Sequence, residues 1–247
     1  PEINIMILEY CPGGSIKSFV DKNKKKPDYI RSAFFQILLG LCVLQYHIKG
    51  FRHNDLHSSN VNVGSYNLDR EEKYQKSLKA HKKMYIAYEI FGETYYIPYY
   101  GFCMKIIDFD VSCSKKIKNG KVNLDKVYVN NGVTCKKNPV FDSHLVMNSC
   151  FYPFFKSGFF GKSSNTELHP EIESFITRNI PLTYIGFNNS KLGYARVKDS
   201  KSIPEELKTP IELITEDKFF DNYRVLPKGG KVIHTYITRI PKIQSLS

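Results

Sequence analysis

Two short polar stretches hold the residues of this sequence that are best suited to chemistry. The first, HNDLHSSN at residues 53–60, places Asp55 five residues before Asn60. The second, IIDFD at residues 106–110, places Asp108 directly after a short apolar run. Magnesium prefers hard oxygen ligands and takes one or two carboxylates together with waters and substrate phosphates. We therefore expect Asn60 and Asp108 to share a magnesium ion, which leaves Asp55 to orient an acceptor hydroxyl.

The strands around these stretches explain how the three side chains would meet. A short strand is predicted at residues 61–63, and another at 105–107 ends at Asp108. Residues 84–104 between them are rich in Tyr, Ile and Phe and are punctuated by glycine and proline, which is typical of an inserted hairpin. Strands that flank such an insertion would pair and bring Asp108 beside Asn60.

Helical patterns account for much of the remaining chain. Apolar residues recur at helical spacing from Tyr29 to Lys49, where Gly50 stops the pattern, and a second apolar pattern from Asp142 to Phe155 also suits a helix. The lysine-rich stretch 114–138 carries two Asn-Gly turn signals and is predicted to be a long surface loop. Prolines divide the tail from Pro181 onward into short helices, such as one from Glu212 to Phe220.

The pair of motifs resembles the active site of protein kinases. HxDLxxxN followed by IDF is similar to their catalytic loop and metal-binding loop. Either motif alone is more often a surface turn, but the two in this order, each at the boundary of an apolar strand, favour the resemblance. It implies that Asp55 is the catalytic base, that Asn60 and Asp108 hold magnesium with ATP, that His53 braces the loop, and that His57 adjoins the transferring phosphate.

The flanking segments extend the resemblance. IMILEYCPGGSIKSFV at residues 5–20 resembles the last strand of the small lobe, the hinge and the helix that follows. This implies that Leu8 lies at the back of the adenine pocket, and that the backbones of Glu9 and Cys11 bind the base. NPVFDSHLVMNS resembles the central helix of the large lobe, in which Asp142 would accept hydrogen bonds from the catalytic-loop backbone. The alternative is that Asp142 only caps its own helix.

The fold that this resemblance implies is α+β. We expect residues 1–247 to form one protein-kinase-like domain, made of the hinge strand and the large C-terminal lobe. It would be mostly helical, with a short β-hairpin at the catalytic loop and an inserted hairpin-like segment. Because the chain starts at Pro1 and has no GxGxxG motif, we expect the small lobe and its phosphate-clamping lysine to lie upstream. The insertion and the tail PIELITEDKFFDNY look most like divergent serine/threonine protein kinases of large DNA viruses.

The implied activity is magnesium-dependent transfer of the ATP γ-phosphate to a serine or threonine hydroxyl of a protein substrate. Two residues depart from the protein-kinase pattern, because His57 stands where a lysine is usual and Asp110 replaces a glycine. Both changes occur in small-molecule kinases of the aminoglycoside and choline type, which are the main alternative. The hinge-like EYCPGG and the long helix before the catalytic loop favour a protein kinase. A pseudokinase binding module is a third hypothesis, and the retained Asp55, Asn60 and Asp108 argue against it.

Composition adds weaker constraints. The formal net charge of +12 is compatible with an acidic partner. However, the excess of lysine over arginine and the absence of tryptophan are also typical of a biased genome, so no specific nucleic-acid partner is indicated. The longest apolar stretch, residues 33–46, is shorter than the roughly 20 residues that cross a bilayer, and no membrane span is expected.

The six cysteines show no CxxC pair and no zinc-like spacing to histidine, so we expect reduced thiols. That expectation points to a cytoplasmic location, which would be the host cytoplasm or the virion if the chain is viral. The cysteines are Cys11, Cys42, Cys103, Cys113, Cys135 and Cys150.

Overall fold

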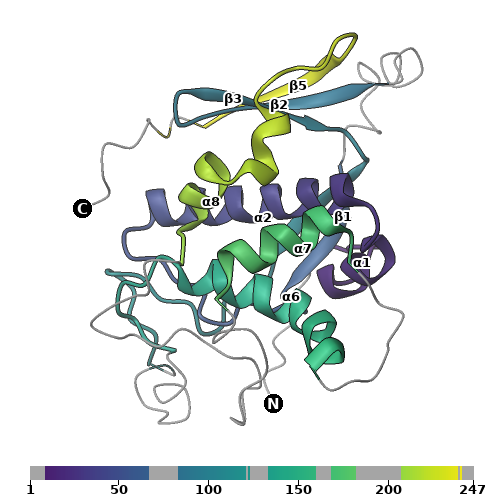
Figure 1. Ribbon diagram of the computed structural model, residues 1–247. Coiled ribbons are helices and arrows are strands. Elements are labelled where there is room, and N and C mark those ends of the chain that lie inside the picture. Colours follow the sequence, from purple (N-terminus) through teal and green to yellow (C-terminus); the bar gives the residue numbers. More distant parts are fainter. Residues whose placement is uncertain are drawn as a thin grey trace.

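The computed structural model describes residues 9–66, 83–120, 122, 133–159, 168–181, 207–238 and 240. These residues form an α+β fold. Helix α2 (Pro27–His47) lies between a small sheet on one side and helices α6 (Phe141–Phe159) and α7 (Pro170–Asn179) on the other (Figure 1). The apolar run at residues 3–8, which includes Leu8, lies outside the described residues.

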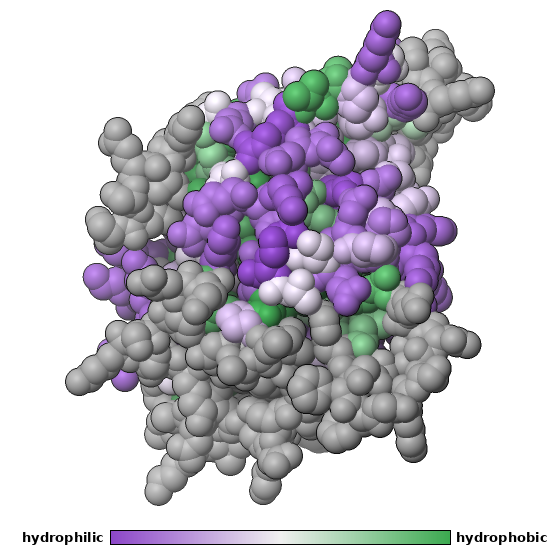
Figure 2. Space-filling view, in the orientation of Figure 1, coloured by the Kyte–Doolittle hydropathy of each residue, from purple (hydrophilic) through white to green (hydrophobic). Residues whose placement is uncertain are grey.

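Helix α2 confirms the long helix predicted from periodicity, with a start two residues earlier. Pro27 occupies its first turn, where the missing N–H costs nothing, and the Ile48 N–H closes the other end on the Leu44 carbonyl. By length and composition α2 also passes as a membrane-crossing helix, yet 61% of its most apolar window is buried within the fold. The face shown in Figure 2 is mainly hydrophilic over the middle of the molecule. The apolar character of α2 is therefore explained by its place in the core.

Strands β1 (Val61–Ser65) and β4 (Phe102–Ile106) form the antiparallel pair expected from the sequence. Their register pairs Val61 with Ile106 and Ser65 with Phe102. The segment before α1 (Ile16–Asn23) runs along β1, because the Gly13 N–H donates to the Val63 carbonyl. A side chain on Gly13 would meet Val63 Cβ at 2.6 Å, so this close approach requires glycine.

The inserted hairpin is confirmed, but its sheet has a third strand. Strands β2 (Met84–Ile90) and β3 (Glu93–Pro98) are antiparallel and joined by a tight turn. Strand β5 (Lys231–Ile237), in the tail that was predicted to hold only short helices and loops, pairs with β2 in parallel. The prediction missed β5 because its partner is distant in sequence and four of its seven residues are exposed, which weakens the strand pattern.

The tail also contains α8 (Pro210–Glu216) and the 3₁₀ helix η3 (Lys218–Tyr223). The single helix expected from Glu212 to Phe220 is therefore wrong, since Asp217 divides it by accepting from the Phe219 N–H and starting η3. Thr209 and Glu212 form a reciprocal capping box at the start of α8.

Candidate active site

The β1–β4 pair brings the segments that carry Asp55, Asn60 and Asp108 to one end of the two strands. The Ile107 N–H donates to the Asn60 carbonyl at 3.0 Å, which extends the strand pairing by one step, and Asp108 directly follows Ile107. Asn60 Nδ2 donates to the Asp55 carbonyl at 2.8 Å and lies 3.4 Å from Asp55 Oδ2. Asp55 and Asn60 are therefore in contact, and Asp108 directly follows the residue whose backbone bonds to Asn60, although 53 residues separate Asp55 from Asp108.

His53 is fully buried and links the two loops. Its Nε2 lies 2.9 Å from the Ile107 carbonyl, which can only accept, so Nε2 carries the proton. The opposite nitrogen, Nδ1, then accepts from the Asp55 N–H at 3.4 Å. This arrangement couples the backbone just before Asp108 to the backbone of Asp55.

Asp142, at the start of α6, binds the backbone of the same loop. Its Oδ2 accepts from the His53 N–H at 2.8 Å and its Oδ1 from the Asn54 N–H at 2.9 Å. Burial raises the pKa of this carboxyl, while His53 and the two backbone donors act in the opposite direction. Both carboxylate oxygens of Asp142 thus accept hydrogen bonds from the backbone of the HNDLHSSN loop, so Asp142 does more than cap its own helix.

Two residues of the site adopt left-handed backbone conformations. Asn54 has φ 70° and Asp108 has φ 62°, values that are uncommon outside glycine and least costly for Asn and Asp. The Asn54 conformation is supported by its Nδ2, which donates to the Val111 carbonyl at 2.9 Å. Backbone strain of this kind, on the order of 1 kcal/mol per residue, clusters at functional sites.

His57 lies against the candidate base. Its N–H donates to the Asp55 carbonyl at 2.8 Å, and its Nε2 lies 3.5 Å from Asp55 Oδ2. The following residue, Ser58, is fully buried and its N–H donates to Ser149 Oγ on α6 at 2.8 Å. The loop is therefore held by α6 on both sides of Asp55, at Asp142 and at Ser149.

The hinge-like segment lies over the β1–β4 pair, close to the same site. The Glu9 side chain is exposed and accepts an ion-pair contact from Lys105 Nζ at 3.1 Å. Cys11 is partly exposed, and its carbonyl accepts from the Gly14 N–H. Lys105 was not singled out from the sequence, since a lone lysine on a strand carries no signal of its partner.

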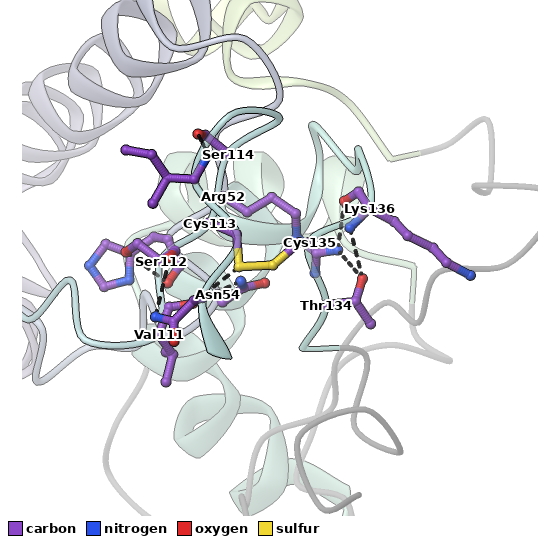
Figure 3. Close-up of a disulfide and its surroundings, with 12 residues drawn as sticks. Arg52, Asn54, Val111, Ser112, Cys113, Ser114, Thr134, Cys135 and Lys136 are labelled. Atoms are coloured by element: carbon purple, nitrogen blue, oxygen red, sulfur yellow. Dashed lines mark hydrogen bonds between the residues drawn. A yellow bond between two sulfur atoms is a disulfide. The ribbon is translucent and has the colours of Figure 1, made fainter. Parts of the chain in front are cut away.

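Arg52 is a second residue that sequence reasoning missed. It is fully buried, its guanidinium lies 4.2 Å from the centre of the Phe141 ring, and its Nη1 donates to Thr134 Oγ1 at 3.1 Å and to the Lys136 carbonyl at 3.0 Å. Its position immediately before the HxD motif was the only available signal. Arg52 joins the HNDLHSSN loop to residues 134–136, which follow the IIDFD stretch in the chain (Figure 3).

The expectation of six reduced thiols is wrong for two of them. Cys113, whose backbone N–H and C=O both bond to Arg52 at 2.9 Å, forms a disulfide with Cys135 (Figure 3). The 22-residue spacing of this pair carries no recognisable signature, because disulfide formation depends on proximity in the fold. The other four cysteines are free thiols.

The donor set at the site fits magnesium. Asn60 Nδ2 is engaged by Asp55, which leaves its Oδ1 as the amide atom that could accept a metal, and Asp108 is exposed. An amide oxygen and a carboxylate are hard ligands that suit magnesium together with substrate phosphates. Within the described ranges, no group of three or more His, Cys, Asp and Glu could hold a metal, so the site does not resemble a zinc centre.

Comparison with known proteins agrees with these motifs. No family model and no solved structure matches the chain. A putative serine/threonine-protein kinase of Acanthamoeba polyphaga mimivirus is 27% identical over 229 residues, which are 90% of this chain and 44% of that protein. The chain is related to protein kinases. Serine/threonine-protein kinase ATG1a of Arabidopsis thaliana is 38% identical over 61 residues, 24% of this chain and 9% of that protein. This kinase-related chain therefore spans less than half the length of either relative.

Proposed function

We propose that the chain is the part of an ATP-dependent protein serine/threonine kinase that carries the catalytic base and the metal ligands. The observations that carry the proposal are the contact of Asn60 with Asp55 and the backbone bond from Ile107 to Asn60, which leads the chain to Asp108 at the same end of the β1–β4 pair. The names of the two relatives support the same activity.

Each residue has a distinct role in this proposal. The Asp55 carboxylate accepts a hydrogen bond from the acceptor hydroxyl and orients it, while Asn60 and His57 limit the movement of Asp55. Asn60 and Asp108 hold magnesium, whose charge offsets the negative charge of the transferring phosphoryl group.

His53 and Asp142 keep the loop backbone in place and contact no substrate. The backbone of Glu9 and Cys11 meets the adenine of ATP.

Two substitutions in the full-length protein test these roles. Asp108→Ala should abolish turnover, because it removes the carboxylate ligand of magnesium. Asp55→Asn should lower turnover by at least about 100-fold, because the amide no longer accepts the hydroxyl proton, and should leave Mg-ATP binding unchanged. Asp221→Asn, at an exposed carboxylate on η3, is the matched control. Full turnover in either site variant would overturn the assignment, and the measurements are initial rates with labelled ATP and calorimetry with Mg-ATP.

A small-molecule phosphotransferase is the second candidate, and the contact of His57 with Asp55 favours it. The acceptor class is decided by incubating the full-length protein with labelled ATP and either casein-like proteins, aminoglycosides or choline. Transfer to protein hydroxyls alone supports the main proposal, whereas transfer to a small molecule alone overturns it.

The binding-module hypothesis makes a different prediction. If the full-length protein fails to bind Mg-ATP although Asp55, Asn60 and Asp108 are intact, the chain acts as a pseudokinase scaffold. Calorimetric titration with Mg-ATP, with the Asp108→Ala variant as the negative control, distinguishes the two.

A further inference from the structure

Six exposed lysines, referred to here as the lysine cluster, surround the start of the catalytic loop. We infer that this cluster selects acceptor proteins that carry acidic residues a few positions from the phosphorylated hydroxyl. The inference rests on the proposed function and names its substrate class. The cluster consists of Lys49, Lys115, Lys116, Lys118, Lys136 and Lys137.

One arm of the cluster is held by a tight turn. The Ser114 N–H donates to the Ile117 carbonyl and the Ile117 N–H donates to Ser114 Oγ, both at 2.9 Å, so Lys115 and Lys116 occupy the tip. The Lys115 N–H also donates to the Lys49 carbonyl at 2.9 Å. The backbone that presents these three lysines is therefore fixed before any partner binds, which lowers the entropic cost of recognition.

The other arm is attached to the same point of the catalytic loop. The Lys136 carbonyl accepts from Arg52, and Cys135 next to it is bonded to Cys113, which pairs with Arg52. Figure 3 shows the Lys136 side chain extending away from Arg52. Both arms thus meet at residues 49–52, immediately before the candidate base.

The chain geometry sets the reach of the cluster. Arg52 precedes Asp55 by three residues, so their Cα atoms are at most about 11 Å apart. An extended peptide covers that distance in about three to four residues. Acidic residues immediately beside the hydroxyl would instead meet the carboxylate of Asp55, which orients that hydroxyl in the proposed function. The favoured acidic positions are therefore about three to six residues from the acceptor.

The local charge is large enough to matter. The described residues 111–120 and 133–137 contain five lysines and no acidic side chain, which with Lys49 gives the cluster six positive charges. Within the part of the chain that the structure describes, none of the six cluster lysines forms an ion pair. A dense patch of one sign attracts a partner of the opposite sign and raises its association rate.

The chemistry of the patch favours an acidic protein over a nucleic acid. Its exposed cations are all lysines, which bind phosphates as point charges without the two-pronged geometry of arginine. The exposed apolar side chains directly beside cluster lysines include Ile117, at 69% exposure, and Ile48, at 38%; both are aliphatic and suit a peptide side chain better than base stacking.

The test uses the full-length protein and synthetic serine peptides whose flanking positions carry either four glutamates or four glutamines. We expect the glutamate peptide to have at least a tenfold lower KM and a similar kcat. The triple variant Lys115→Gln, Lys116→Gln, Lys118→Gln should raise the KM for the glutamate peptide about tenfold, because each exposed ion pair contributes a small factor. The glutamine peptide should be unaffected. Lys22→Gln, Lys218→Gln, Lys228→Gln is the matched control at exposed sites elsewhere.

Each outcome has one meaning. The inference is overturned if the wild-type protein has equal KM values for the glutamate and glutamine peptides. It is also overturned if the cluster variant and the control variant raise the KM for the glutamate peptide equally. Both results leave the kinase proposal intact. A single-stranded oligonucleotide that binds only when the cluster is present, without a peptide preference, also overturns it in favour of a nucleic acid. Absence of phosphorylation of every peptide and of casein-like proteins counts against the proposed function itself. Peptides with phosphoserine in place of glutamate show whether the cluster prefers phosphate groups or carboxylates, through the KM values of the two peptides.

Discussion

The catalytic loop and the aromatic core beside α2 are equally buried but are held together in opposite ways. The loop buries polar side chains, none of them more than 7% exposed, and its backbone is held by directed hydrogen bonds to Asp142 and Ser149; the buried side chains are Arg52, His53, Asn54, Ser58 and Asn60. In the core, Phe35 of α2 packs against four aromatic rings with centroids 5.4–5.9 Å away, namely Tyr88, Tyr95, Phe220 and Tyr223.

This difference teaches which perturbations each region can absorb. Burial of apolar area has no direction, so a core can repack around a similar side chain with a modest loss. A hydrogen-bonded loop has discrete donors and acceptors, and the loss of one acceptor leaves buried donors without a partner. Substitutions in the core should therefore change mainly stability, whereas substitutions under the loop should change the geometry of the site.

The largest expected effect on stability comes from the core. Phe35→Ala removes a ring that four aromatic neighbours contact, and we expect the free energy of unfolding to fall by about 3–5 kcal/mol. Urea denaturation followed by circular dichroism measures the change. Phe35→Leu is the control and should cost clearly less, because it retains much of the volume. The Mg-ATP affinity of the fraction that remains folded should be unchanged. If Phe35→Ala lowers the free energy of unfolding by less than about 1 kcal/mol, the packing argument is contradicted.

A smaller loss of stability but a stronger local effect is expected at Asp142. Asp142→Ala leaves the N–H groups of His53 and Asn54 buried without acceptors, at about 1–3 kcal/mol each. Removing a buried carboxylate also relieves its desolvation cost, so we expect a net loss of about 2–3 kcal/mol. Turnover should fall by more than the decrease in the folded fraction of the protein explains, because the loop that Asp142 holds carries Asp55.

Amide hydrogen exchange at His53 and Asn54 measures this local effect directly. It should accelerate in Asp142→Ala and remain slow in Phe35→Leu. Asp221→Ala, at an exposed carboxylate, is the matched control for loss of charge. Unchanged exchange at both amides would show that Asp142 does not hold the loop.

The same contrast explains what the sequence could and could not predict. Helix α2 and the β1–β4 pair were predicted because apolar spacing and strand boundaries are local features. The backbone bond between Asn60 and Ile107, the residue before Asp108, continues that pairing. The contacts of Arg52 with Thr134 and Lys136, and the disulfide from Cys113 to Cys135, depend on how a long segment returns to the loop, and no local pattern encodes that return.

Strand β5 and the break at Asp217 were missed for related reasons. A parallel edge strand pairs with a partner far away in sequence, so its own residues carry little of the signal. Asp217 lies inside an apparently continuous helical pattern. Its carboxylate is committed to α7, where it accepts from Arg178 and Asn179, and this tertiary contact interrupts the helix.

Asp217 provides the smallest and most specific prediction. Burial tends to raise the pKa of this carboxyl, but hydrogen bonds from Arg178, Asn179 and the Phe219 N–H outweigh it and lower the pKa below the ordinary value. The ionised form therefore stabilises the fold above the unfolded-state pKa of about 3.9, and this contribution is lost as the pH falls through the folded-state pKa. We expect Asp217→Asn to cost about 1–2 kcal/mol at pH 7 and progressively less below pH 4. Urea denaturation at several pH values, with Asp221→Asn as control, measures the difference. A pH-independent loss would show that Asp217 acts as a neutral helix cap, like the polar caps of the surface helices, and not as a buried ionic anchor between α7 and η3.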